Sequence, residues 1–469
     1  MSRLLWCSFA LFLAVPVHAA DPSQPLTRIA FGSCADQKKV QPIWKSVFAT
    51  KPELFLFMGD NIYADLPKKP ADVEMIKNAY AEAMKQEGYQ KLFKTCPVLA
   101  MWDDHDYGVN DGGVEYPFKK EAQQLLLDFT NEPKDSPRRT QEGVYFAKVF
   151  GPEGKRVQVI LLDTRYFRSA LKTGPFIPNV GEYIPNNDPQ ATMLGEAQWA
   201  WFAEQLKVPA DVRLIVSTVQ LISEDHQWER WANMPLEQAK MHKLLKDSKA
   251  TGIIFLSGDR HLADMSMRTD VTDYPLYDIT SSGLNQGFKG WRVPERNRYR
   301  VASMSYGDNF GLITIDWEKP DPLIAMQLRD VDGDIIVQQK IPLSLLKAGA
   351  IRNPEPKNPT VVEGVLTPAQ AAEKVNSKCT VQMKVLSTGA SGNKELIYLN
   401  SEPNFRNQGN FTISLSVADL KEKLPNLKGE DYQDKTVQVT GVVTKGTGGA
   451  RLMVRSANDL KIVDATKKD

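Results

Sequence analysis

Long apolar runs are scarce in this chain, and neither sign of charge dominates. Beyond the N-terminal segment, no stretch approaches the roughly 18 apolar residues that a membrane-spanning helix needs. The formal net charge is +1 at pH 7, so bulk electrostatics gives no strong nucleic-acid or membrane signal. Only five histidines and four cysteines are present. The length of 469 residues suggests two or three domains.

The N-terminus has the layout of a Sec-type secretory signal. A basic residue precedes a short apolar core, and small residues lead to Ala19. We expect a signal peptide over residues 1–19, without a twin-arginine pair, and a mature protein that is periplasmic or secreted. An uncleaved membrane anchor is the alternative, although the apolar core is short for a span. The mature chain would keep Cys34, Cys96 and Cys379, an odd number that cannot pair fully.

Apolar runs and helical periodicity alternate over the first part of the chain. This alternation predicts an α/β domain with a mostly parallel sheet covered on both faces. Strands that follow one another after residue 275 predict a second sheet that closes the domain, which we place at 27–345. The predicted strands are 27–33, 53–58, 97–102, 156–162, 213–219, 252–257, 276–280, 310–316, 322–330 and 333–341, and the predicted helices are 40–48, 72–94, 195–207 and 235–248.

The composition changes after a segment that resists regular structure. Three prolines lie close together within residues 346–362, which predicts a linker. Five short strands and one helical stretch follow, and they predict a small all-β barrel over 363–469. The expected elements of this tail are strands 379–385, 396–399, 411–415, 436–443 and 452–454 and a helix near 416–424.

Polar clusters follow three of the predicted apolar strands. Asp60 and Tyr63 come directly after strand 53–58, and a carboxylate with a nearby phenolate suits a hard cation such as ferric iron. An ordinary turn is the alternative for this Gly-Asp-Asn segment. Tyr80 is the second candidate for the phenolate. Because ligands in α/β sheets bind at the carboxyl ends of strands, we expect these clusters to surround one point.

The densest cluster is Asp103-Asp104-His105-Asp106. Crowded carboxylates repel one another unless a cation is present, so we interpret Asp104 as a metal ligand. His105 is interpreted as the donor to the developing charge or the leaving oxygen, with Asp106 orienting its imidazole. Asn110 could add an amide oxygen to the metal. A solvated acidic loop is the alternative.

The third cluster follows strand 252–257, and two other strands also end in candidates. Asp259 and His261 are two residues apart, which places an oxygen and a nitrogen ligand on the same side of a strand end. Cys34 ends the first strand and is interpreted as a thiolate ligand, with a buried apolar thiol as the alternative. Arg165 is the candidate for a bidentate clamp on phosphate, with Arg168 competing and a plain surface ion pair as the alternative.

These motifs resemble the PhoD-type alkaline phosphatases of the calcineurin-like metallophosphoesterase superfamily. The middle lone His of the superfamily pattern has no counterpart, because Ser217 to Gln220 occupy that stretch, so one ligand position is unassigned. The tail resembles small oligonucleotide/oligosaccharide-binding (OB-like) barrels of exported hydrolases. The motifs that carry the first resemblance are Gly32-Ser33-Cys34, Gly59-Asp60 with Tyr63, Asp103-Asp104-His105-Asp106 and Gly258-Asp259-Arg260-His261.

The resemblance implies a fold and an activity. The fold would be a mixed two-sheet sandwich flanked by helices, with a small OB-like barrel appended. The activity would be hydrolysis of phosphate monoesters or diesters by metal-activated water, with Fe³⁺ and Ca²⁺ as cofactors and Zn²⁺ or Mn²⁺ as substitutes. The alternative is a non-catalytic or weakly catalytic protein on a degenerate hydrolase scaffold. In either case the tail would bind a polymer or glycan.

Overall fold

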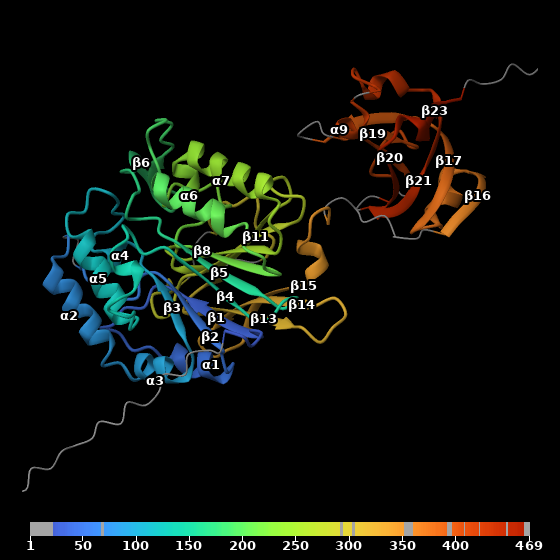
Figure 1. The fold of residues 1–469 in the computed structure, drawn as a ribbon. Helices are drawn as coiled ribbons and strands as arrows, with labels where there is room; N and C mark the ends of the chain where they lie inside the picture. Colours follow the sequence, from blue (N-terminus) through green and yellow to red (C-terminus); the bar gives the residue numbers. More distant parts are fainter. Residues whose placement is uncertain are drawn as a thin grey trace, which may run out of the picture. The chain divides into compact units, whose positions relative to one another are not determined.

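The computed structural model describes residues 22–66, 70–290, 294–302, 305–350, 360–391, 396–407, 409–421, 423–446 and 449–463. The chain forms two compact units, residues 1–351 and 352–469 (Figure 1). The predicted signal peptide lies outside the described residues, and so does most of the predicted linker. Within the described part of the chain, none of the helices has the length and apolar character that a membrane crossing requires.

The first sheet of the N-terminal unit is mixed and has six strands. Parallel strands β1, β2 and β3 continue into an antiparallel group, in the order β15-β14-β13-β1-β2-β3. Apolar side chains fill both faces of β2, as expected for a buried strand. The strands are β1 (Arg28–Gly32), β2 (Leu54–Met58), β3 (Val98–Met101), β13 (Asn309–Asp316), β14 (Leu323–Asp330) and β15 (Ile335–Pro342).

The second sheet has seven strands in the order β12-β10-β11-β9-β8-β5-β4. Its central strands are parallel, and antiparallel strands lie at both edges. The strands are β4 (Phe146–Phe150), β5 (Val157–Leu162), β8 (Val212–Ser217), β9 (Ile253–Ser257), β10 (Leu262–Arg268), β11 (Leu276–Ser281) and β12 (Ser305–Tyr306).

The predicted two-sheet sandwich is confirmed, but the strands divide between the sheets differently from the prediction. The parallel strands do not form one sheet: β1, β2 and β3 belong to one, and β5, β8, β9 and β11 to the other. The strands predicted to form a separate closing sheet instead join both. The sequence could not show this division, because the apolar periodicity indicates which segments are strands but not which strands pair with one another.

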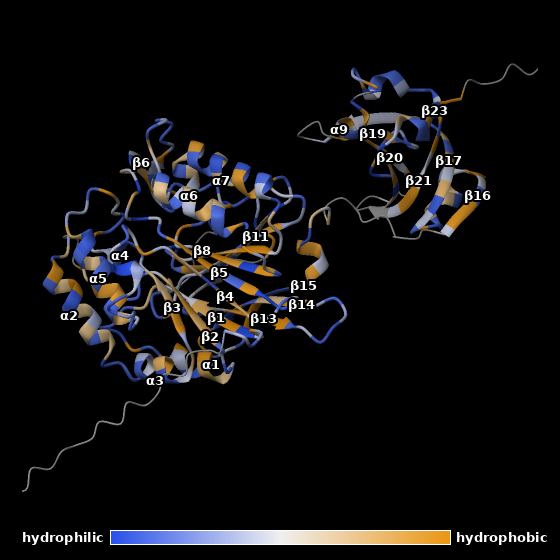
Figure 2. Cartoon of the chain, in the orientation of Figure 1, coloured by the Kyte–Doolittle hydropathy of each residue, from blue (hydrophilic) through white to orange (hydrophobic). Residues whose placement is uncertain are grey.

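Helices flank the sandwich. In Figure 1, α1 and α3 lie beside β2 and β3 and α2 lies next to α5, whereas α6 and α7 lie on the other side, beside β8 and β11. The strands of this unit are mainly apolar and the helices are more mixed (Figure 2). The helices are α1 (Ile43–Ala49), α2 (Val73–Ala83), α3 (Glu87–Thr95), α4 (Asp104–Tyr107), α5 (Lys119–Phe129), α6 (Gly195–Gln205) and α7 (Pro235–Ser248), with 3-10 turns η1 (Pro137–Arg139), η2 (Trp231–Asn233) and η3 (Leu343–Leu346).

The long helix predicted over 72–94 is wrong, because α2 and α3 are separate. Gln86 between them is extended, and its side-chain Nε2 donates to the carbonyl of Gln37 at 2.7 Å. Gly88 in α3 approaches Trp44 so closely that a Cβ would lie 2.1 Å from the indole. This close approach turns α3 against α1. A short hairpin, β6 (Lys172–Ile177) with β7 (Gly181–Ile184), was not predicted.

The C-terminal unit is all-β with short helices. Its strands form a path, β16-β17-β21-β22-β20-β19-β18, whose pairings among the described residues do not close into a ring. The closed barrel is therefore not observed, and the OB-like assignment stays a prediction. The elements are β16 (Thr360–Leu366), β17 (Ser377–Lys384), β18 (Ser387–Ala390), β19 (Leu396–Asn400), β20 (Thr412–Ser416), β21 (Thr436–Gly446), β22 (Gly449–Val454), β23 (Leu460–Ile462), α8 (Pro368–Ala372), α9 (Val417–Leu420), η4 (Gly429–Tyr432) and η5 (Ala457–Asp459).

Candidate metal centre

The predicted ligands lie where strands of both sheets end. Cys34, Asp60, Asp259 and His261 follow β1, β2 and β9 and have left-handed backbone conformations, with φ of 62°, 51°, 66° and 55°. A left-handed backbone conformation costs a non-glycine residue about 1–3 kcal/mol. Residues strained in this way are found mainly at functional sites. The strained turns aim side chains from two sheets at one region, whereas the sequence suggested a single sheet edge.

Gly59 brings the ends of β2 and β3 together. Its φ is 96°, and a Cβ at this position would lie 2.4 Å from the Cβ of Asp103. Only glycine combines this conformation with so close an approach. The turn after β2 therefore packs directly on the turn after β3, which places Asp60 beside the carboxylates that follow β3.

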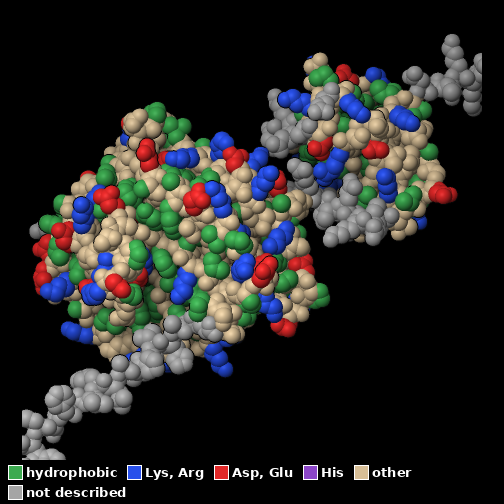
Figure 3. Space-filling view, in the orientation of Figure 1, with side chains coloured by type: hydrophobic (Ala, Val, Ile, Leu, Met, Phe, Trp, Pro, Cys, Tyr) green, Lys and Arg blue, Asp and Glu red, His purple; other side chains and the backbone are tan. Residues whose placement is uncertain are grey.

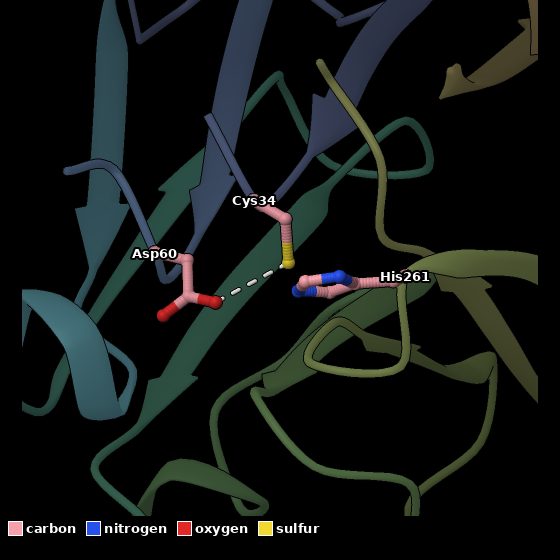
Figure 4. A group of neighbouring side chains, drawn as sticks. All are labelled: Cys34, Asp60 and His261. Carbon is pink, nitrogen blue, oxygen red and sulfur yellow. Dashed lines mark hydrogen bonds between the residues drawn. The ribbon is translucent and has the colours of Figure 1, made fainter. Parts of the chain in front are cut away.

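One group of side chains combines sulfur, oxygen and nitrogen. The ligand atoms of Cys34, Asp60 and His261 lie within 4.8 Å of one another, and the three side chains point toward a shared point (Figure 4). The Cys34 thiol donates to Asp60 Oδ2 at 3.3 Å. The Tyr63 hydroxyl donates to the same oxygen at 3.2 Å and lies 3.2 Å from His261 Nε2. Tyr63, not Tyr80, is therefore the phenol at this group.

Burial governs the ionisation of this group. Desolvation raises the pKa of the Cys34 thiol to about 11, with only partial relief from hydrogen bonds to Ser282 and Ser33. Burial also raises the pKa of Asp60 well above its usual value, helped by the proximity of Cys34 and Asp104. The pKa of His261 falls to about 4 because of burial and the positive charge of His105 and Arg260. Anionic ligands at such a site need a cation to offset their charge.

His105 is oriented by Asp65 and not by Asp106, which corrects the sequence-based assignment. Nδ1 of His105 lies 2.6 Å from Asp65 Oδ1. Asp106 instead accepts backbone N–H groups of the surrounding turns, from Asp103 at 2.6 Å and Asn61 at 3.1 Å. Because Asp106 lies three residues from Asp103, in the first turn of α4, its carboxylate fixes the backbone of the site.

The charge on His105 reflects its acidic surroundings. Burial by itself would lower the pKa of the imidazole, but Asp104, Asp60 and Asp65 outweigh that effect and raise the pKa to about 11. Cations bound to these carboxylates would oppose that increase. With Nδ1 held by Asp65, Nε2 is the ring atom that can donate a proton to a substrate.

A second group contains only carboxylates. Oxygens of Asp104, Asp111, Glu229 and Asp259 lie within 4.8 Å of one another. Burial raises the pKa of Asp259 well above its usual value, and proximity to Glu229 adds to the increase. The same two causes raise the pKa of Asp111. Four carboxylates in this space repel one another, so this arrangement favours a bound cation.

Asn110 is exposed, and its backbone N–H donates to Asp65 at 2.8 Å. The neighbouring Asp111 belongs to the second group, and Asn110 as a metal ligand stays a prediction. The hydroxyl of Tyr183 in β7 donates to Asp111, so the unpredicted hairpin contacts this group.

Arg165 is buried among carboxylates and is not free to clamp phosphate, which corrects the predicted role. Its guanidinium donates to both oxygens of Glu229, at 2.8 and 2.6 Å, and to Asp103 at 2.6 Å. Arg168 also pairs with Glu229, at 3.1 Å. These two cations keep the pKa of Glu229 below its usual value in spite of burial. Arg165 therefore positions Glu229 through a buried ion pair, whereas the alternative was an ion pair at the surface.

Sequence reasoning missed Asp65, Asp111 and Glu229. All three lie in loops, where no periodicity indicates direction. Asp111 directly follows the Asn110 that was chosen. Glu229 comes from the connection after β8 and offers a carboxylate that could bind a cation.

The two groups fit different metal ions. Thiolate, phenolate and imidazole around Asp60 suit a transition metal such as iron or zinc. The all-oxygen group around Asp104 suits a hard cation such as calcium. Cys96 and Cys379 are buried free thiols, and neither belongs to one of the groups of possible ligands.

Comparisons with known proteins bear on the family and the fold. The family model of the PhoD-like phosphatases matches residues 29–284. The solved structure of PhoD aligns over 68% of this chain and 72% of its own, with 17% identity and a TM-score of 0.54. A purple acid phosphatase, PPD1 from yellow lupin seeds, covers 68% and 54% with 10% identity and a TM-score of 0.46. GAP50, the anchor in the inner membrane complex of Plasmodium, covers 70% and 93% with 14% identity and a TM-score of 0.46. No curated protein gives a match.

Proposed function

The chain belongs to the PhoD-like phosphatase family, and from this premise we propose that it hydrolyses phosphate monoesters, phosphate diesters or both. The observation that carries the proposal is the meeting of two ligand groups at the strand ends. Asp60 and Asp104, one from each group, also lie together with His105 in a third set of close ligand atoms. Two adjacent cation positions are the arrangement that suits displacement at phosphorus.

Each cation position has its own set of residues. Cys34, Asp60, Tyr63 and His261 would hold Fe³⁺, because thiolate and phenolate favour a transition metal. Zn²⁺ or Mn²⁺ are substitutes. When bound, such cations lower the pKa of a water molecule and offset negative charge on the phosphoryl oxygens. Iron held by tyrosinate absorbs visible light, so a colourless, fully active preparation containing only zinc would contradict the iron assignment.

The second position would hold Ca²⁺, through the oxygens of Asp104, Asp111, Glu229 and Asp259. Arg165 keeps Glu229 ionised and oriented toward this position. His105 would donate a proton through Nε2 to the leaving oxygen, with Asp65 holding the ring. In this proposal the carboxylates bind the cation and His105 donates the proton.

The N-terminal segment bears on where the protein acts. The N-terminal pattern of residues 1–19 supports export through the Sec route, and the protein would then act on phosphate esters in the periplasm or outside the cell. The test is the N-terminal sequence of protein recovered from an exporting host. A mature chain that starts at Ala20 supports the proposal, whereas an intact Met1 on exported protein contradicts cleavage.

The activity is tested by hydrolysis of p-nitrophenyl phosphate and of bis(p-nitrophenyl) phosphate by purified protein. We expect turnover of at least one ester, loss of turnover after chelation and recovery after metals are restored. The ratio of the two rates decides between monoester and diester preference. Metal-loaded protein that hydrolyses neither ester, nor any member of a wider panel of phosphate esters, would support the degenerate scaffold instead.

A further inference from the structure

The hairpin of β6 and β7 carries apolar side chains that lie outside the core of the first unit. Phe176 is 58% exposed, and Ile177 beside it is 43% exposed. In the region where Figure 1 labels β6, Figure 3 shows hydrophobic side chains at the surface. Exposed apolar side chains that lie together often mark a binding surface. Such a surface can serve the active site only if the hairpin is joined to the metal ligands.

Backbone hydrogen bonds join the hairpin to the loop that carries Glu229. The Tyr183 N–H donates to the Gln227 carbonyl at 2.7 Å, and the Gln227 N–H donates back to the hairpin at 2.6 Å. Gly181 approaches this loop so closely that a Cβ would lie 2.3 Å from the Gln227 oxygen. The Tyr183 hydroxyl also donates to Asp111. The hairpin is therefore fixed against two of the residues that form the carboxylate group.

Aromatic and guanidinium groups form a continuous row between this hairpin and the metal ligands. Phe176 contacts Trp228 edge to face, with ring centres 6.1 Å apart. The Arg260 guanidinium lies over the Trp228 ring, 5.3 Å from its centre. Arg260 directly follows Asp259, and Trp228 directly precedes Glu229, and both of these carboxylates belong to the second ligand group. The row therefore begins beside the position proposed for Ca²⁺.

Arg260 keeps an unused hydrogen-bond donor in this row. Its side chain is buried, with 7% of the residue exposed, and its Nη2 donates to Glu295 at 2.5 Å. Its Nε makes no hydrogen bond to any described residue. A buried donor without a partner costs about 1–3 kcal/mol, which an oxygen of a bound ester would recover. Trp228 is half-buried, so part of its ring is also available to a ligand.

We propose that Phe176, Trp228 and Arg260 form the binding surface for the organic part of the substrate, and that they select phosphate esters that carry a planar ring. Aromatic rings and guanidinium groups have flat faces, on which planar groups stack better than saturated groups do. The ring can belong to an aryl alcohol or to the base of a nucleoside, because both are planar. The selection rests on the proposed function, since it concerns the ester that the same metal centre would hydrolyse.

The first test measures binding, which does not require turnover. Phenylphosphonate, cyclohexylphosphonate and methylphosphonate share one headgroup and have no ester bond, so the metal-loaded full-length protein cannot hydrolyse them. We expect phenylphosphonate to bind more tightly than the other two in calorimetric titrations. Phe176→Ala should weaken phenylphosphonate binding about 2- to 12-fold, which is the effect of one aromatic contact. The same variant should weaken methylphosphonate binding less.

Hydrolysis identifies the source of the ring. Phenyl phosphate, adenosine 5′-monophosphate and glycerol 2-phosphate are compared, or their methyl diesters if the protein hydrolyses only diesters. Phe176→Ala should lower kcat/KM more for at least one of the two ring esters than for the glycerol ester. A larger loss for phenyl phosphate identifies an aryl ester as the substrate, and a larger loss for the adenosine ester identifies a nucleotide.

A matched control and the contrary outcomes keep the binding surface separate from the activity. Phe405→Ala removes a ring that is 56% exposed in the C-terminal unit and should change neither binding nor hydrolysis. Because Phe176 is exposed, its variant should keep the melting temperature of the unchanged protein. Equal affinity for phenylphosphonate and cyclohexylphosphonate, an equal effect of Phe176→Ala on the phenyl and methyl ligands, or no binding of any phosphonate would overturn the proposal. Binding of phenylphosphonate that requires Phe176, in a protein that hydrolyses no ester, would support the binding surface and contradict the proposed activity.

Discussion

At the scale of single residues, His105 has a proposed role that differs from the role of the metal ligands around it. Its ring is held by Asp65, and its backbone N–H donates to Asp104 at 3.0 Å. His105→Ala should therefore lose about 10²–10⁴-fold in turnover while the protein retains its metals. The measurement combines steady-state kinetics with elemental analysis of the same samples. His242→Gln, outside the centre, is the control and should keep full turnover.

Near-normal turnover of His105→Ala would show that another group supplies the proton. Loss of metal together with turnover would make His105 a ligand, which its place beside Asp60 and Asp104 allows geometrically. If Asp65→Asn loses much less turnover than His105→Ala does, Asp65 only orients the imidazole ring.

His226 provides a pH-dependent contribution to stability. It is buried, and desolvation together with Arg260 and Arg230 holds its pKa well below the usual 6.5. Below pH 6.5 His226 is protonated in the unfolded chain but stays neutral in the folded protein. The free energy of unfolding therefore falls as the pH falls. Between pH 7.5 and 5.5 this single group should cost about 1.4 kcal/mol.

Urea unfolding at both pH values measures this loss. His226→Gln cannot titrate and keeps an amide that can pair with Gln220, which now lies 2.9 Å from His226 Nε2. The variant should therefore lose about 1.4 kcal/mol less than the unchanged protein on acidification. Equal losses in both proteins would mean that His226 is protonated in the folded state.

At the scale of elements, the site depends on how tightly two strand ends approach. Gly59→Ala places a methyl group 2.4 Å from the Asp103 Cβ and strains a backbone with φ of 96°. We expect the turns after β2 and β3 to separate, with loss of metal and of most turnover and a lower melting temperature. Gly154→Ala is the matched control, because φ is 82° but nothing lies within 4 Å of the added methyl.

Melting temperature and bound metal are measured for both variants. The difference between them separates the effect of backbone strain from that of the close contact with Asp103. Gly154→Ala should cost about 1 kcal/mol through strain alone and keep its metal. Should Gly59→Ala bind metal as the unchanged protein does, the close approach of the strand ends would not matter for the site.

Strands and helices with strong periodicity could be predicted from the sequence, and the loops between them could not. Helix α7 has the bounds that its apolar pattern predicted, and β2 differs by one residue. The ligands directly after strands, such as Asp60 and Asp259, could be found because apolar runs mark where strands end. Asp111 and Glu229 could not, since their positions depend on how long loops return to the site.

At the scale of the whole molecule, the two units should be separable. The first core includes Leu346, which is fully buried, and the Leu346 carbonyl accepts the backbone N–H of Gly252 at 2.8 Å. A chain cut at 345 would lose this contact, so the predicted boundary of 345 moves to 350. We expect a 22–350 fragment to fold and to hydrolyse small phosphate esters at the rate of the full chain.

Circular dichroism and esterase assays on the fragment check this prediction. A 22–345 fragment is the control and should be less stable, because it lacks the last turn that packs on the core. A folded 22–350 fragment without activity would show that the C-terminal unit completes the active site.

The proposed pair of cation positions, which differ in their chemistry, lies side by side in the first unit. Its most direct test is elemental analysis of the purified protein and of two variants. Asp60→Ala removes a ligand of the sulfur-containing group, and Asp111→Asn changes the carboxylate group without leaving Arg165 unpaired. We expect a transition metal and calcium in the unchanged protein, loss of the transition metal in Asp60→Ala, and selective loss of calcium in Asp111→Asn. An active protein without bound metal, or variants that keep the metal content of the unchanged protein, would contradict it.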